Sequence, residues 1–177
     1  MKSTRFVFGR ALAVLCALLF VSFGFMSCQQ EDETEYVNYS LTGTWVNSYS
    51  GGTSVYKITS STFDNSGTSS YNGTTSTYDA YAGNNLVVSY TNDEETAGYI
   101  YIKYTRAMNP DYSYSETAPD VGKWYAIAFK DLTASSLSLS GAYNASGKTS
   151  TETLEEAIST FTIANGYFNN YSECVKQ

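Results

Sequence analysis

From Leu41 onward the chain consists of short runs in which apolar and polar residues alternate, separated by Gly, Ser, Asn and Asp. A period of two, in runs rich in Tyr, Val, Ile and Thr, is typical of β-strands with one buried and one wet face. In the clearest run Leu137 and Leu139 fall on one face and serines on the other. The pattern predicts strands at 44–49, 54–60, 76–82, 86–91, 99–106, 123–131 and 136–143.

One segment breaks this alternation. Leu154, Ala157 and Phe161 recur at helical spacing, which predicts a short helix within 149–160. Two starting points fit, because a threonine, either Thr149 or Thr153, stands three residues before a glutamate in each case, as in a capping box. The sequence leaves the choice between them open.

The last apolar segments, 161–163 and 167–171, are separated by Asn165 and Gly166, a strong β-hairpin signal. With this hairpin the chain has eight or nine predicted strands and one late helix. We therefore predict a single all-β domain over 41–177, an antiparallel meander that closes into a barrel or folds into a sandwich. Closure into an eight- or nine-stranded barrel is favoured because it removes exposed strand edges.

The first 27 residues have the pattern of a secretory signal peptide. Lys2, Arg5 and Arg10 precede an uncharged apolar run over 11–26. This run is shorter than the roughly 20 residues that a transmembrane helix needs. A signal peptide at 1–27 is thus the prediction, with a retained transmembrane helix as the alternative.

The apolar run ends at Ser27 followed by Cys28, with Phe25 and Met26 in front of them. A small residue directly before a cysteine at this place resembles the lipobox of bacterial lipoproteins. In that family the cysteine receives a diacylglycerol thioether and becomes the acylated N-terminus, although Phe25 and Met26 replace the usual leucine-like and small residues. The resemblance implies lipidation at Cys28, and two or more acyl chains, at about 0.8 kcal/mol per buried CH₂, form a stable membrane anchor.

Residues 29–35 include four acids in seven positions and almost nothing to bury. Residues 28–40 are therefore predicted to be the lipidated cysteine and an extended acidic tether. The acidic stretch is also similar to export signals that follow the lipidated cysteine in bacteria displaying lipoproteins on the outer face of the outer membrane. This likeness implies an outer-membrane, surface-exposed location, while a plain solvated linker and a periplasmic location stay open.

Gly43, Thr44 and Trp45 open the first predicted strand. They resemble the Gly-x-Trp signature of the lipocalins and the wider calycin group, in which the Trp plugs the closed end of an eight-stranded barrel. Together with the lipobox, the runs 102–106 and 122–125 are also similar to a group of small, functionally uncharacterised calycin-like bacterial lipoproteins. The resemblance implies fold and location but no active site, and an ordinary core aromatic is the alternative for Trp45.

Several chemistries are excluded by composition. The chain has no histidine, so histidine triads, histidine metal ligands and an imidazole pH switch are absent. Of its three cysteines, Cys16 lies in the leader and Cys28 is the lipidation candidate, which leaves Cys174. The mature domain therefore has no intramolecular disulfide, CxxC pair or cysteine-rich zinc site. We expect no metal and no cofactor, and we expect Cys174 to be a small buried apolar residue.

The charge distribution also narrows the partners. Three of the ten basic residues lie in the leader, so the mature part has seven basic and seventeen acidic residues and a formal net charge of −10. Such a chain is repelled by phosphate backbones and anionic headgroups, which argues against nucleic-acid binding and polybasic membrane attachment. The acids are equally consistent with plain solubility of an exposed protein.

The long connection 107–121 contains both prolines, Pro110 and Pro119. Connections of this length are often functional, so it could form a lid or contact surface or be a passive loop. If the strands form a cup, one face of 99–106 lines it, and the sequence leaves open which. One face holds Tyr99, Tyr101 and Lys103, and the other holds Ile100, Ile102, Tyr104 and Arg106. The candidate ligand-contact residues are Trp45, Tyr99, Tyr101, Lys103, Tyr104, Arg106, Tyr112, Tyr114, Lys123 and Trp124, and Glu116 and Asp120 are further polar residues of the loop.

Three functions fit the sequence. The first is a non-catalytic, surface-anchored module that binds a small amphipathic, peptide or glycan ligand, supported by seventeen tyrosines that offer flat rings with a polar tip. Tyrosine is also an ordinary strand residue. The second is an accessory interaction subunit of an outer-membrane complex, such as a nutrient importer of the SusC/SusD type. The third is a hydrolase that uses a pair of carboxylates, which we disfavour because no catalytic motif is present.

Overall fold

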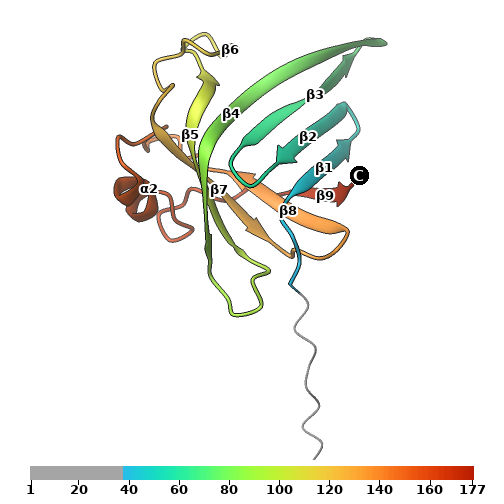
Figure 1. The fold of residues 1–177 in the computed structure, drawn as a ribbon. Coiled ribbons are helices and arrows are strands. Elements are labelled where there is room, and N and C mark those ends of the chain that lie inside the picture. The colour runs from blue at the N-terminus through green and yellow to red at the C-terminus, as the bar shows by residue number, and fades with distance from the viewer. Residues whose placement is uncertain (1–37) are drawn as a thin grey trace, which may run out of the picture. The chain divides into compact units, whose positions relative to one another are not determined.

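In the computed structural model, which describes residues 38–177, eight strands close into an antiparallel barrel (Figure 1). Each strand pairs with the next along the chain, apart from β6, and β9 pairs with β1 to complete the closure. The barrel strands are β1 (Gly43–Tyr49), β2 (Gly52–Ile58), β3 (Phe63–Tyr71), β4 (Thr74–Tyr90), β5 (Gly98–Met108), β7 (Trp124–Lys130), β8 (Ser136–Gly141) and β9 (Ser172–Lys176). The all-β barrel prediction is confirmed, and it is compatible with a calycin-like fold.

Two elements lie outside the barrel wall. The short strand β6 (Tyr114–Ser115) folds back onto the end of β5, and helix α2 (Leu154–Thr160) lies between β8 and β9 in the chain. The predicted leader, Cys28 and most of the predicted tether fall outside the described residues. Between residues 38 and 177, no helix has the length and apolar character needed to cross a membrane.

Strand β3 was not predicted from the sequence, because its buried face carries little apolar surface. Phe63, Asn65 and Gly67 alternate inward along it. The amide of Asn65 is satisfied by donating to the carbonyl of Val55, 3.3 Å away. A polar residue and a glycine at inward positions hide the period-two pattern, although the strand is fully paired with β2 and β4.

The predicted strands 76–82 and 86–91 are a single long strand, β4. Its register against β5 shifts between Ala82 and Gly83 and again between Asn84 and Val87. Asn85 has a φ of 52° inside the strand. The sequence break between the two predictions thus coincides with a β-bulge of β4 between Asn84 and Val87, next to a bulge on the facing strand β5, and these bend the strand without ending it.

The start of α2 agrees with one of the two alternatives. The Thr153 hydroxyl accepts from the backbone N–H of Glu156 at 3.2 Å, and the Glu156 carboxylate in turn accepts from the N–H of Glu152. The earlier start at Thr149 is wrong, because the Thr149 hydroxyl donates to Asp120 at 2.7 Å. The helix begins where a threonine can satisfy a free N–H group of its first turn.

The predicted hairpin around Asn165 and Gly166 is wrong. These residues form a turn after α2, in which Gly166 has a φ of 76° and donates its N–H to the carbonyl of Ile163. The Asn165 amide donates to the carbonyls of Ser159 and Thr160 at the end of the helix. The Asn-Gly pair therefore closes the helix, and the last strand lies further on, at β9.

The barrel interior is filled with side chains. Trp45, Phe63 and Ile100 are at most 1% exposed, and a ladder of aromatic rings continues from them toward Tyr81, Tyr104 and Tyr125. The rings of Tyr104 and Tyr125 are stacked with centroids 4.8 Å apart, and Tyr81 meets Tyr125 edge-on at 5.3 Å. The aromatic residues that could have lined a cup thus pack against one another.

These packed tyrosines predict a delayed alkaline titration. Burial raises the pKa of the Tyr81, Tyr104 and Tyr125 phenols well above the ordinary value near 10. Above pH 10 the unfolded chain therefore loses protons that the folded barrel keeps, and the free energy of unfolding falls as pH rises. In a 295 nm titration, part of the tyrosinate signal should appear only together with loss of near-UV circular dichroism. A titration completed while the near-UV signal is intact would contradict this packing.

Candidate functional site

The structure decides which face of β5 lines the barrel. Ile100, Ile102 and Tyr104 belong to the interior core. Tyr99 and Tyr101 lie on the outer face, where a second apolar cluster forms beneath α2 and the segment that follows it. Tyr101 is 2% exposed, and burial raises its pKa to about 12. Neither tyrosine is placed to face a ligand inside the barrel.

Arg106 leaves the face that alternation assigns to it. Tyr104 and Ala107 both join the interior core, because the register shift opposite Ala82 inserts one extra residue into β5. The Arg106 guanidinium instead reaches across β4, where it pairs with Asp64 at 3.0 Å and donates to the carbonyls of Asn65 and Ala80. Its donors are engaged in joining three strands, so we remove it from the ligand-contact candidates.

Trp45 is a core residue rather than a contact residue. Its ring is 0% exposed, and Nε1 donates to the carbonyl of Leu41 at 2.8 Å. The ammonium group of Lys176 lies 4.9 Å from the ring centroid. Trp45 therefore contacts both Leu41, just before β1, and Lys176 of the last strand, β9.

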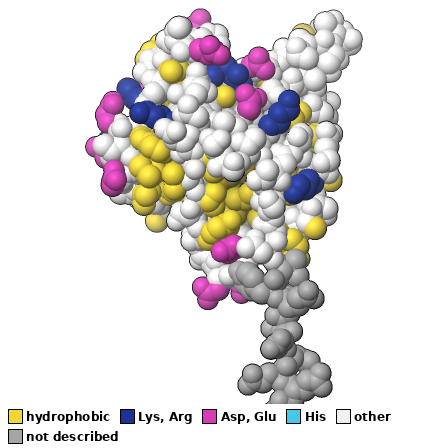
Figure 2. Space-filling model, viewed as in Figure 1, with side chains coloured by type: hydrophobic (Ala, Val, Ile, Leu, Met, Phe, Trp, Pro, Cys, Tyr) yellow, Lys and Arg dark blue, Asp and Glu magenta, His cyan; other side chains and the backbone are white. Residues whose placement is uncertain are grey.

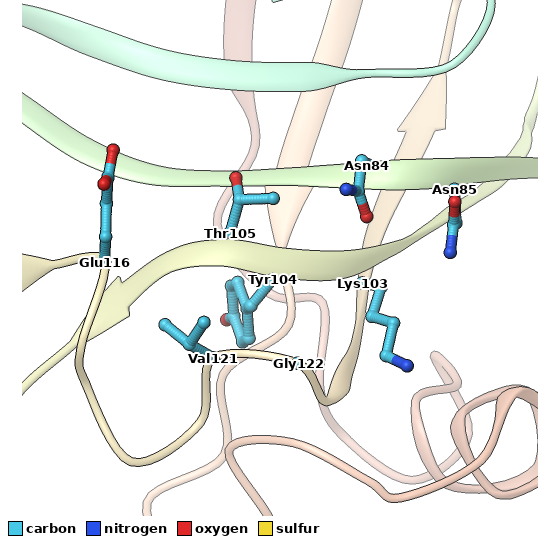
Figure 3. A pocket seen from close by; sticks show the side chains of 8 residues that line it. All are labelled: Asn84, Asn85, Lys103, Tyr104, Thr105, Glu116, Val121 and Gly122. Carbon is cyan, nitrogen blue, oxygen red and sulfur yellow. The ribbon is translucent and has the colours of Figure 1, made fainter.

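Two hollows on the protein surface are considered as sites. The larger of these two is an open groove of about 540 Å³ between β4, β5 and the end of the long loop (Figure 3). Most of the side chains that line it are polar. It is lined by Asn84, Asn85, Lys103, Tyr104, Thr105, Glu116, Val121 and Gly122.

The groove is formed where the loop returns to β5. The N–H of Gly122 donates to the carbonyl of Tyr104, and the N–H of Tyr104 donates to the carbonyl of Lys123, both at 2.9 Å. Ala118 is 4% exposed and packs into the barrel core, which holds the middle of the loop down. On the opposite side, the bulged part of β4 places Asn84 directly across from Lys103.

Asp120 fixes the base of this loop. Its carboxylate accepts from the Lys123 ammonium at 3.4 Å and from the Thr149 hydroxyl at 2.7 Å. Burial opposes ionisation of Asp120, but hydrogen bonds from Thr149, Ser150 and Lys123 outweigh it and lower the pKa. Lys123 also pairs with Glu152 at 3.5 Å. Both Asp120 and Lys123 are thus used structurally.

Lys103 and Glu116 differ from that pair. Within residues 38–177, neither forms an ion pair. In Figure 3 they lie toward opposite ends of the groove, with Thr105 between them and Asn84 facing Lys103, and their charged ends point away from each other. The groove therefore presents a free cation and a free anion separated by neutral hydrogen-bonding groups.

The structure brings together only some of the predicted contact residues. Lys103 and Tyr104 line the groove, and Trp124 is the cross-strand partner of Lys103 on β7. Tyr112, 81% exposed, and Tyr114, 38% exposed, lie in the outer part of the loop and do not line the groove. Of the four loop side chains named as candidates from the sequence, Tyr112, Tyr114, Glu116 and Asp120, only Glu116 lines this groove.

Sequence reasoning missed Asn84, Asn85, Thr105, Val121 and Gly122. The first two occupy the gap between the predicted strands 76–82 and 86–91. A polar interruption of a strand pattern is a signal for a bulge, and bulges re-aim side chains. That signal could have identified the asparagines as candidates.

A second, smaller hollow of about 230 Å³ lies where the chain enters the barrel. It is lined by the incoming residues from Asn38 to Thr42, the turn from Ile58 to Ser60, and Leu86, Val88 and Tyr90. Tyr39 packs partly against the core there. The end of the predicted tether is thus already docked on the barrel.

The remaining chemistry of the described residues is limited. Cys174 is 2% exposed, which confirms it as a buried core residue, and burial raises the pKa of its thiol to about 12. Between residues 38 and 177, no three acidic or cysteine side chains lie close enough together to hold a metal ion. Glu116 is the carboxylate among the residues that line the groove, whereas a glycosidase of the usual kind uses two.

No family model matches the chain, and comparisons with curated proteins and with solved structures found no match.

Proposed function

We propose that the chain is a non-catalytic binding module that holds a polar ligand, a short peptide or a glycan, in the groove between β4, β5 and the long loop. The observation that carries the proposal is the contrast between a packed barrel interior and an open groove with unpaired polar groups. Amides, a hydroxyl and two charges offer the directional contacts by which such ligands are recognised. The ligand site therefore lies on the outside of the barrel rather than inside a cup.

We further propose that the protein is a calycin-like lipoprotein anchored through Cys28 and displayed on the outer membrane. Support comes from the charged and apolar order of the leader, the Ser27–Cys28 pair and the acidic stretch over 29–35. A binding module on a tether outside the membrane meets extracellular peptides and glycans directly. The periplasmic face is the alternative location.

The binding proposal is tested by probing the purified chain on arrays of glycans and short peptides, followed by titration of any hit. Lys103→Met and Glu116→Gln should each weaken binding of a hit about tenfold, because each removes a charge-assisted hydrogen bond of roughly 1.5 kcal/mol. Lys57→Met on β2 and Glu155→Gln on α2 change charge equally at exposed positions away from the groove and should leave affinity unchanged. A hit with unaltered affinity for both groove variants would place the site elsewhere.

A second candidate is the accessory interaction subunit. It is favoured by the aromatic rings of Tyr71 and Tyr112, which are 79% and 81% exposed at the tips of a hairpin and a loop. Exposed tyrosine is enriched at protein interfaces. Purification from membranes in mild detergent should then recover a second membrane protein in fixed proportion, and recovery of the chain alone would contradict this role.

A further inference from the structure

One stretch of β4 has a strand neighbour on only one side. Pairing between β4 and β5 begins at Ala82, and β6 pairs with β5 rather than with β4. From Thr74 to Asp79 the strand is therefore paired with β3 alone. This part belongs to the long hairpin that projects beyond the rest of the barrel in Figure 1.

The register shows which backbone groups are free there. The N–H of Ser70 donates to Gly51, so even-numbered residues of β3 face β2 and odd-numbered residues face β4. Ser69 is opposite Ser76, and Gly67 is opposite Tyr78. The even-numbered residues of β4 consequently bond to β3, and Thr75, Thr77 and Asp79 direct their N–H and C=O groups outward.

The edge lacks the devices that usually protect such strands. Folded proteins block open edges with lysine, proline or a covering element. The segment from Thr74 to Tyr78 contains threonine, serine and tyrosine only, with no charge and no proline. Its residues are exposed except for partly buried Tyr78, and in Figure 2 the projecting hairpin at the upper right carries no charged side chain. Only at the base of this edge is β4 irregular, where its register against β3 shifts between Asp64 and Ser66 and Arg106 donates to the Ala80 carbonyl.

We propose that this edge pairs with the same edge of a second copy of the chain, as two antiparallel strands related by a twofold axis. Outward-facing residues must meet one another, and centring the pair on the free segment from Thr74 to Asp79 places the axis at Ser76 or Thr77. In those registers Thr75 faces Thr77, or Thr77 faces itself. Asp79 then lies opposite Gly73 or Thr75 rather than opposite its own copy. The pairing brings no like charges together, although the mature chain is strongly acidic.

The pairing is expected to be weak, and its action at the membrane rests on the lipid anchor proposed above. One short polar strand pair buries much less than the roughly 1,200 Å² of a stable interface. Molecules confined to one surface meet at a high effective concentration, which makes such a contact effective. The pair would present two grooves on one unit.

Cysteine cross-linking of the full chain in native membranes tests the pairing. Thr75→Cys/Thr77→Cys should give a disulfide-linked dimer on mild oxidation, because one register sets position 75 opposite position 77 and the other sets position 77 opposite its own copy. Thr68→Cys/Ser70→Cys places the same spacing on β3, whose two sides are occupied by β2 and β4, and should give little dimer. A dimer yield no higher than this control, or cross-linking to a protein of different mass, would overturn self-pairing.

A proline variant gives a second readout. Thr77→Pro removes an outward N–H without breaking a bond to β3, since edge strands tolerate proline at such positions. Sedimentation of the detergent-solubilised full chain should show a dimer fraction that falls at least severalfold in Thr77→Pro. An unchanged dimer fraction, or no dimer in the unmodified chain at any concentration up to the solubility limit, would contradict the proposal.

Discussion

Replacing Trp45 with alanine should destabilise the barrel more than any other single change discussed for the described residues. The side chain is fully buried, and the Leu41 carbonyl accepts its N–H. Removing a buried tryptophan leaves a cavity and an unpaired carbonyl, which together lower the free energy of unfolding by about 3–5 kcal/mol. This is a large part of the roughly 5–15 kcal/mol that holds a typical domain together. A fall in Tm of roughly 10 °C or more is expected for a domain of this size.

Three comparisons separate the contributions to this loss. Trp45→Phe keeps most of the ring but removes the hydrogen bond to Leu41, so its loss should be intermediate. Lys176→Met removes the cation above the ring, a contact worth about 0.5–1 kcal/mol, together with the hydrogen bond from the Lys176 ammonium to the Ser40 carbonyl. Trp124, the second tryptophan of the chain, is partly exposed, and Trp124→Ala should be milder. Urea denaturation of the four variants measures these differences, and a Trp45→Ala protein as stable as Trp124→Ala would contradict the core assignment.

The fold was predictable because most barrel strands show their burial in a period-two pattern. In the strands that carry Leu137, Ile100 or Ile127, alternate apolar side chains fill the barrel core, and the sequence displays this directly, although two of the serines on the other face of β8 are buried as well. The pattern fails at β3, where Asn65 and Gly67 occupy inward positions and are accommodated by hydrogen bonding and close packing. Backbone pairing with β2 and β4 stabilises β3 as a strand, and its local sequence pattern does not show this pairing.

The candidate groove was less predictable, because it depends on where a loop returns. Lys103 and Glu116 are separated by the turn at the end of β5, and they share a groove only because Ala118 packs into the core and Gly122 bonds to Tyr104. Neither contact has a sequence signature. The sequence also left open which face of β5 lines the barrel interior, because tyrosine and isoleucine side chains can both be buried in a core. The helix and its following segment cover Tyr101, and that docking decided the matter.

The predicted lipid anchor involves residues outside the described part of the chain. Cys28→Ala should abolish membrane anchoring completely. In the proposed pathway the Cys28 thiol carries the diacylglycerol, and its amino group becomes available only after cleavage of the leader. Without the thiol no acyl chain is attached, and the binding energy of about 0.8 kcal/mol per buried CH₂ is lost over the whole of each chain. The variant should therefore show no incorporation of a labelled fatty acid, persist as a precursor with its leader, and disappear from the outer-membrane fraction.

The other two cysteines provide matched controls for this experiment. Cys16→Ala changes a thiol inside the leader, and Cys174→Ala changes a buried thiol of the barrel, so both should retain the lipid label and the mature size. Protease treatment of intact cells then separates surface display from a periplasmic location, because only a displayed barrel is accessible. Replacing the four acids of 29–35 with asparagine or glutamine tests the export signal itself: lipidation should persist while protease access is lost. Mature-sized, labelled Cys28→Ala protein in the outer membrane would refute the lipobox interpretation. An accessible, acid-free variant would refute the export signal alone.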